Sequence, residues 1–229
     1  MCLKWGTKYS AEYVNRLHSM VERNLSLPYT FVCFTDDSRG IDCNIQCKPL
    51  PNLPVNGWWY KPVFFDPDFV LKGTILFLDL DLIIFRNIND LFTYQPNKFC
   101  IIRDFNRATI RNFNRMNSSV FRLQTGQHRS VYDNFIKEPL QTSRRFHGDQ
   151  DWIFNQVKTD FVFWPDEWIQ SYKWEMRGRP LMSRDPKTGK RNFKEPGEPR
   201  VLNDTKIAVF HGEPNPQDCK DPWVIENWR

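Results

Sequence analysis

The sequence lacks any apolar run of the roughly 18–20 residues that a membrane-spanning helix requires. It also lacks a recognisable secretory leader, because the N-terminus runs directly into Lys4 and a helix-like pattern. Its six cysteines include no Cys-x-x-Cys pair and no zinc-binding spacing. Cys33 and Cys100 lie in apolar, strand-like runs and are expected to be reduced core residues. These features predict a cytoplasmic location.

Internal repeats and interdomain linkers are also absent from the sequence, and 229 residues fit one domain. Hydrophobic residues make up 40% of the chain, which is enough to bury a full core. Aromatic residues are abundant, with 19 Phe and 9 Trp. Most of these rings are expected in the core, although an aromatic excess also suits clefts in which rings stack on sugars. We therefore predict a single domain over residues 1–229.

The net charge of +5 is concentrated in one segment. Eight basic and three acidic residues lie between 177 and 200, so this segment accounts for the whole imbalance. It is rich in Pro and Gly and has almost no periodicity, which predicts a long, mobile loop. It is either an ordinary solvated loop, or a lid on the acceptor side, or a peripheral contact with a membrane or an anionic glycan.

The beginning of the chain reads as strand, helix and strand. Residues 2–5 and 31–34 predict the strands, and Val14, Leu17 and Val21 recur at helical spacing between them. This order predicts a parallel sheet with a right-handed crossover. Further strands are expected at 44–56 (weak), 74–85, 99–102, 116–123, 161–164 and 207–210, and helices at 58–65, 89–92, 130–136 and from 148 onward.

The most hydrophobic run, 74–85, contains two carboxylates. In a strand, residues two apart point to the same side, so Asp79 and Asp81 converge on one place. Ionised Asp is rarely buried unless it is paired or bound to a metal. One reading is a hard-cation site at the end of a central strand, and the other is a strand end with two solvated acids.

A second stretch with chemical character runs from Arg103 to Arg115, where arginines alternate with Asn and Phe. Interleaved basic and aromatic residues are typical of single-stranded nucleic-acid binding. The stretch is short and lies in no recognised binding module, so nucleic acid is not the expected partner.

Four segments, in order, resemble family 8-type glycosyltransferases, the relatives of glycogenin and of bacterial galactosyltransferases. Asp79-Leu80-Asp81 is similar to the family's D-x-D segment, and Met116-Asn117-Ser118-Ser119-Val120 to its F-N-S/A-G-V strand. Gly148-Asp149-Gln150-Asp151 is similar to its D-Q-x-x-L-N helix start, and His211-Gly212 with Lys220 to its C-terminal H-x-x-G-x-x-K-P-W. The order and spacing make this resemblance more specific than D-x-D alone.

The resemblance implies a GT-A fold, an α/β architecture with a mixed, mostly parallel sheet flanked by helices. It implies a retaining hexosyltransferase that uses a nucleotide sugar, usually a UDP-sugar. It also implies Mn²⁺, with Mg²⁺ as the alternative, held by Asp79, Asp81 and His211. A divalent cation can neutralise the charge on a departing diphosphate, and carboxylates plus an imidazole suit manganese better than magnesium. A purely structural His211 is the alternative.

Further donor contacts follow from the same resemblance. Lys61 matches a basic residue near the donor phosphates, and Lys220 matches a diphosphate-binding lysine at a longer spacing. Tyr9 is expected to stack on the base, although packing against the first helix would also explain it. The implied set is Trp5, Thr7, Tyr9, Asp36, Asp37, Lys61, Leu80, Gly212 and Lys220. The alternatives are a surface role for Lys220 and a loop turn or cap for the two acids at 36 and 37.

Asn117, Asp149 and Gln150 carry the donor-sugar and reaction-centre roles by resemblance. Asp149 would otherwise cap the helix that begins there. Ser119 stands where the family usually has Gly, which would narrow the donor-sugar pocket. No carboxylate can be placed as a nucleophile, so front-face attack is favoured over a covalent intermediate. His128 and His147 are expected to be surface or structural residues.

The sequence therefore predicts a metal-dependent, retaining glycosyltransferase that moves a sugar from a UDP-sugar to a glycan, lipid-linked glycan or other hydroxyl acceptor. Within enzymes, the alternatives are an inverting transferase or a donor hydrolase. From another class, the alternative is a nucleotide-sugar-binding or glycan-binding protein without significant turnover.

Overall fold

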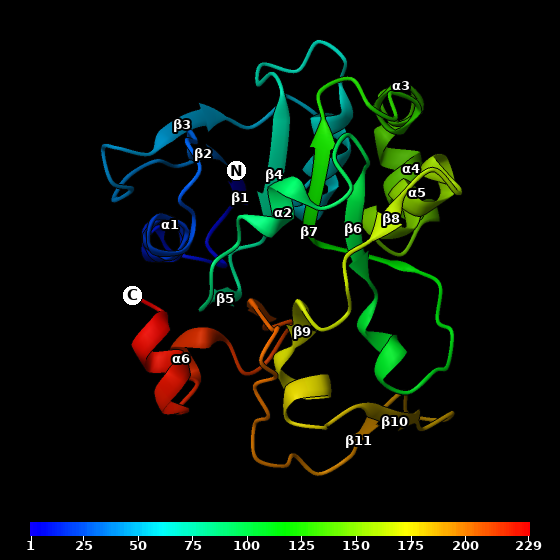
Figure 1. Ribbon diagram of the computed structural model, residues 1–229. Coiled ribbons are helices and arrows are strands. Elements are labelled where there is room, and N and C mark those ends of the chain that lie inside the picture. Colours follow the sequence, from blue (N-terminus) through cyan, green and yellow to red (C-terminus); the bar gives the residue numbers. More distant parts are fainter.

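A central sheet crosses the computed structural model, which describes residues 1–229 except for the side chains of Leu181 and Arg191 (Figure 1). Its N-terminal part has the parallel order β1-β2-β3, and its other part has the order β4-β7-β6-β8, in which β7 runs antiparallel to both neighbours. Backbone hydrogen bonds of Met1 with Leu76 and Leu78 join the two parts. These strands are β1 (Cys2–Lys4), β2 (Val32–Thr35), β3 (Gln46–Pro49), β4 (Thr74–Leu78), β6 (Cys100–Arg103), β7 (Met116–Gln124) and β8 (Val162–Phe163).

The strands β1, β2, β4, β6 and β7 are largely buried on both faces because they are apolar on both sides, whereas the edge strand β3 is mostly exposed. Along β4, Leu76 and Leu78 pack in one core cluster, and Ile75 and Phe77 pack in the other. The first cluster includes the buried side of α1 (Ala11–Asn24). The second lies under η1 (Gly57–Phe65), α3 (Ser130–Phe135) and α5 (Asp149–Val157). The mixed α/β architecture expected from the sequence is confirmed.

A smaller sheet with the order β5-β12-β9 lies beyond the central one (Figure 1). It corrects the expectation of one strand over 74–85, because β4 ends at Leu78 and the next strand begins at Leu82. The chain leaves one sheet and enters the other at the two aspartates, where a continuous buried strand would have to bury both carboxylates. The strands are β5 (Leu82–Ile84), β9 (Ile169–Ser171) and β12 (Ile207–Val209).

The basic segment 177–200 was expected as a long, mobile loop, and the structure corrects the expectation that it has no regular elements. It contains an antiparallel hairpin of β10 (Leu181–Arg184) and β11 (Arg191–Phe193). Turn residues Asp185 and Gly189 close it, with a backbone hydrogen bond of 2.8 Å. The remaining elements are α2 (Asp90–Thr93), η2 (Phe105–Ala108), α4 (Pro139–Arg145), the π-helix η3 (Tyr172–Met176), η4 (Pro216–Asp218) and α6 (Pro222–Asn227).

Two further sequence expectations are met by the structure. Cys33 and Cys100 are buried free thiols, as expected. Within the described part of the chain, every helix is too short or too polar to cross a membrane.

Candidate active site

A cavity of about 320 Å³ opens where the central sheet meets the smaller one. Trp5, which follows β1, and Asp79, which follows β4, lie in its wall together with the start of α5. Ligands of open α/β sheets bind beyond the carboxyl ends of the strands, and this cavity has that position. Its volume falls in the range of small-ligand sites.

Asp79 and Asp81 are held by the backbone on both sides. The amide of Asp79 donates to Ser119 O at 2.8 Å, and the carbonyl of Asp81 accepts from Phe210 N at 2.8 Å. Asp79 is thereby tied to β7 and Asp81 to the chain just after β12. Both carboxylates line the cavity, so the convergence expected from their spacing is found without a continuous strand.

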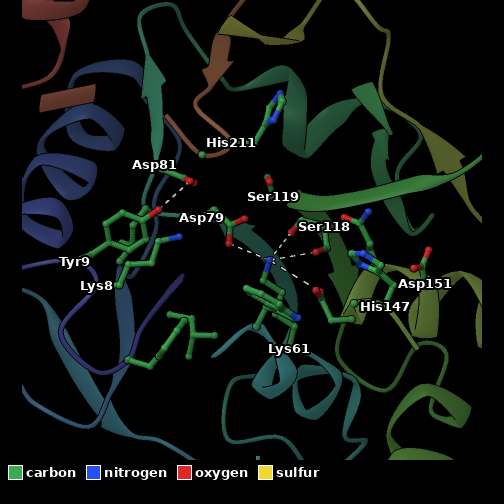
Figure 2. A pocket seen from close by; sticks show the side chains of 18 residues that line it. Lys8, Tyr9, Lys61, Asp79, Asp81, Ser118, Ser119, His147, Asp151 and His211 are labelled. Atoms are coloured by element: carbon green, nitrogen blue, oxygen red, sulfur yellow. Dashed lines mark hydrogen bonds and ion pairs between the residues drawn. The ribbon is translucent and has the colours of Figure 1, made fainter. Parts of the chain in front are cut away.

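Lys61 lies beneath Asp79 and is almost completely buried, with 3% of its surface exposed. Its Nζ is 2.9 Å from Asp79 Oδ1 and donates to both the carbonyl and the hydroxyl of Ser118 (Figure 2). Asp149 Oδ2 is 4.0 Å from the same nitrogen. Burial alone would lower the pKa of Lys61, but the charges of Asp79 and Asp149 outweigh it and raise the pKa. Lys61 is therefore the internal countercharge of the site.

Asp81 forms no such ion pair, and Tyr9 is its hydrogen-bond partner, while the charge of Lys8 offsets only part of the effect of its burial. The Tyr9 hydroxyl donates to Asp81 Oδ2 at 2.9 Å. Burial, followed by the negative charge of Asp79, raises the pKa of Asp81 to about 6. Burial also raises the pKa of Tyr9, as does the charge of Asp81. Tyr9 thus lines the cavity with its hydroxyl bonded to a carboxylate, and its stacking on a base stays a prediction.

His211 lines the same cavity but is not gathered with the two aspartates. Its Nε2 is 2.6 Å from Ser171 Oγ, and its ring stacks on Phe105. Figure 2 shows the ring turned away from Asp79 and Asp81. Burial, and then the charge of Lys173, lowers the pKa of His211 to about 3, so the imidazole is neutral. Among the described residues, no three His, Cys, Asp or Glu side chains form a metal-sized cluster.

The expected reaction-centre residues separate into two groups. Asp149 and Gln150 line the cavity from the first turn of α5, and Asp149 Oδ2 is buried without a hydrogen bond. Asn117 is outside the lining, because its Oδ1 accepts the backbone N–H of Ser119 at 3.0 Å. Ser118 and Ser119 line the cavity in its place. Nothing in the pattern of β7 distinguishes these neighbours before the register is known.

The expected donor contacts also divide. The cavity wall includes Trp5, Tyr9, Lys61, Leu80 and Gly212 and does not include Thr7, Asp36, Asp37 or Lys220. Asp36 accepts the N–H of Gly6, and Asp37 pairs with Arg39 in its own loop, which is the turn alternative.

Sequence reasoning did not assign Lys8, Trp58, His147 or Asp151, all of which line the cavity. His147 is exposed, as expected of a surface residue, yet it stands at the cavity mouth. The adjoining Asp149-Gln150 motif was the available signal for His147 and Asp151.

The arginine-rich stretch 103–115 is partly internal. Arg107 binds Glu175 at 2.7 Å and Asp166 at 3.0 Å, and only 7% of its side chain is exposed. Asp104 caps η2 by accepting from Asn106 N. Arg107 therefore stabilises the fold, whereas Arg115 at the end of the stretch is exposed.

No protein-family model matches the sequence, and no curated protein sequence matches it. Solved structures do match. The galactosyltransferase LgtC, in complex with donor and acceptor sugar analogs, superposes with a TM-score of 0.67 at 12% identity over 98% of this chain and 92% of its own. The glycosyltransferase GlyE of Streptococcus pneumoniae TIGR4 has a TM-score of 0.64 at 12% identity. The bifunctional glycosyltransferase WbbM has a TM-score of 0.58 at 13% identity.

This chain spans 60% of the GlyE chain and 50% of the WbbM chain. At such low identity the likeness establishes the fold alone. That fold is the GT-A fold, which confirms the fold expected from the four sequence motifs.

Proposed function

We propose that this protein is a metal-dependent, retaining glycosyltransferase that takes its sugar from a nucleotide sugar, most simply a UDP-sugar. The observation that carries the proposal is the pair Asp79 and Asp81 in a cavity at the sheet edge of a GT-A fold. The three solved structures compared above are glycosyltransferases, and LgtC was seen with donor and acceptor sugar analogs. A carbohydrate acceptor is therefore proposed as well.

The donor set of the two aspartates fits a hard divalent cation. Burial and the charge of Asp79 raise the pKa of Asp81, so the negative charge of its carboxylate is not fully balanced within the protein. A bound cation would supply the missing positive charge. We propose that Asp79 and Asp81 would hold Mn²⁺ or Mg²⁺. Because its ring is turned away from the two aspartates, His211 would become a third ligand only by rotating toward them, which breaks its hydrogen bond to Ser171. A bound cation would neutralise charge on the diphosphate leaving group.

Lys61 fixes the Asp79 carboxylate through a 2.9 Å ion pair. Asp149 is held by the same ammonium and is buried, so it is poorly placed to act as a free nucleophile. The Gln150 amide is 3.4 Å from Asp104 and lines the cavity, where it can bind a sugar hydroxyl or the ring oxygen. This arrangement favours front-face attack.

In that step the acceptor oxygen bonds to the anomeric carbon on the face from which the diphosphate leaves. The bond between that carbon and the phosphate oxygen breaks, and the pair of electrons goes to the diphosphate. The proton of the acceptor hydroxyl passes to the departing phosphate oxygen. Because the new bond forms on the face from which the diphosphate leaves, the configuration at the anomeric carbon is retained.

A panel of nucleotide sugars with Mn²⁺, scored for donor hydrolysis, tests the proposal without knowledge of the acceptor. Thermal stabilisation by Mn²⁺ with UDP, together with hydrolysis of one donor, is the expected result. The engagement of His211 with Ser171 favours a second candidate, a nucleotide-sugar-binding protein without significant turnover. Stabilisation without hydrolysis or transfer would favour that candidate, and no stabilisation would refute the donor site.

A further inference from the structure

A second, larger cleft of about 670 Å³ adjoins the proposed donor cavity. The two share His147 and Asp151, so one cleft opens from the mouth of the other. The other residues that line the second cleft are Arg115, Arg145, Phe146, Phe154, Asn155 and Lys158. None of these six lines the donor cavity.

The position of the second cleft indicates which substrate it faces. Figure 2 shows Lys8 and Tyr9 on one side of the donor cavity and His147 and Asp151 on the opposite side, with Asp79 and Lys61 between them. If the nucleotide lies toward Tyr9, a ligand in the second cleft approaches the reaction centre from the other side. That is the side open to an acceptor.

The cleft is lined by cations on aromatic walls. The Arg115 guanidinium lies 4.7 Å from the ring centre of Phe154, and that of Arg145 lies 5.1 Å from Phe146. Lys158 ends α5 on the same side. In the described part of the chain, no carboxylate lies within 4.0 Å of any of these three cations. Asp151 is the acid in the wall, and it stands at the junction with the donor cavity.

Three separate parts of the fold bring these groups together. Asp151 and Asn155 are four residues apart and therefore share one face of α5, and Lys158 is the residue that caps the C-terminus of that helix. Arg145 ends α4, and Arg115 immediately precedes β7. Arginine near a helix C-terminus is favoured by the helix dipole, which explains a basic residue at 145. The helix dipole does not account for Arg115, which comes from a distant segment and lines the same cleft.

Resting on the proposed glycosyltransferase function, we propose that this cleft is an acceptor subsite for an anionic sugar, one bearing a carboxylate or a phosphate. Guanidinium groups bind both oxyanions in a planar, bidentate manner. The half-buried rings of Phe146 and Phe154 form the apolar part of the cleft wall. Asp151 is then placed to accept a hydrogen bond from a hydroxyl of the acceptor where the two cavities meet.

Direct binding tests the subsite independently of turnover. Methyl glucuronide, glucose 6-phosphate and methyl glucoside are titrated into the full-length protein and followed by ligand-observed NMR at low and high salt. Both anions, or one of them, should bind at least about tenfold more tightly than the neutral sugar, and added salt should reduce the difference. The preferred anion distinguishes a uronic acid from a sugar phosphate. Equal binding of charged and neutral sugars would overturn the inference.

Variants locate the binding. R115Q/R145Q should lower the affinity for the preferred anion about tenfold or more. The matched control is R144Q, because Arg144 is exposed on the same last turn of α4 but does not line the cleft. If the double variant does not fold, R115Q and R145Q are measured singly. An unchanged affinity in these variants, or an equal loss in R144Q, would refute the cleft as the site.

Donor hydrolysis by the unaltered protein separates this inference from the function on which it rests. Hydrolysis of a nucleotide sugar without any preference for anionic sugars would remove the subsite and leave the transferase proposal intact. Anion binding that depends on Arg115 and Arg145, in a protein that neither binds UDP nor consumes any donor, would contradict the transferase proposal instead.

Discussion

The donor cavity and the adjoining cleft both use positive charge, but in opposite ways. In the donor cavity the ammonium of Lys61 is buried and bound to Asp79, Asp149 and Ser118. In the second cleft the arginines at 115 and 145 are exposed and rest on aromatic rings. The charge of Lys61 is balanced by carboxylates of the site itself, whereas the charges of Arg115 and Arg145 remain available to bind a ligand.

This difference indicates how each region should respond to mutation. A buried cation between two carboxylates cannot be removed without leaving charge uncompensated, so its loss affects folding. Removing an exposed cation costs little stability, and it matters to function only if a ligand binds that cation. The following predictions test that contrast, beginning with the largest effect.

Asp81→Asn should reduce the consumption of the preferred nucleotide sugar with Mn²⁺ by about 100-fold or more, because it removes one carboxylate of the proposed cation site. Asp160→Asn is the control, since Asp160 is an exposed acid whose contact with Lys98 is 3.7 Å. Turnover is measured at saturating and limiting metal. If excess Mn²⁺ leaves both proteins equally active, Asp81 does not bind the metal.

Lys61→Met should lower the free energy of unfolding by about 3 kcal/mol, because Asp79 and Asp149 would be left without their countercharge. Lys98→Met removes a lysine from an exposed pair and should cost less than about 1 kcal/mol. Urea denaturation followed by fluorescence gives both values. Equal losses would mean that burial of the Lys61 network does not matter to stability.

Much of this arrangement was predictable because it rests on local patterns. Continuous apolar runs predict β4, β6 and β7, and the two aspartates stand out because carboxylates are unusual in such a run. The order of four motifs then predicts the GT-A fold. Asp79, Asp81, Asp149 and Gln150 are brought together in the cavity as expected.

What could not be predicted depends on register and on contacts between distant segments. Asn117 and Ser118 are neighbours in sequence, and only the pairing of β7 decides that Ser118 lines the cavity. The rotamer of His211 depends on Ser171, forty residues away. The second cleft combines Arg115 with residues of α4 and α5, and no local sequence pattern predicts that these segments meet.

The pH dependence of stability gives a finer test of the donor cavity. The folded-state pKa of Asp81 is raised to about 6, above the ordinary value of about 3.9 for Asp. Ionisation is therefore harder in the folded protein than in the unfolded one, and stability decreases as the pH rises from about 4 through about 6. Asp81→Asn removes this group, so in metal-free buffer the variant should melt at a higher temperature than the unaltered protein at pH 7.

The two proteins should differ less at pH 4, where Asp81 is mostly protonated in the folded state. Thermal melting in EDTA at both pH values measures the difference. A variant that is less stable than the unaltered protein at pH 7 would show that Asp81 is compensated within the protein and does not require a cation.

The smallest expected effect concerns His211 and separates a ligand from a structural residue. Ser171→Ala removes the hydroxyl at 2.6 Å from Nε2, which His211 must otherwise release before it can bind a cation. A hydrogen bond is worth about 1 kcal/mol, so Mn²⁺ affinity should rise about fivefold if His211 is a ligand. Ser143→Ala, at an exposed helical serine bonded to Leu140 O, is the control. Calorimetric titration with Mn²⁺ measures both, and unchanged or weaker binding in Ser171→Ala would assign His211 a structural role beside Phe105.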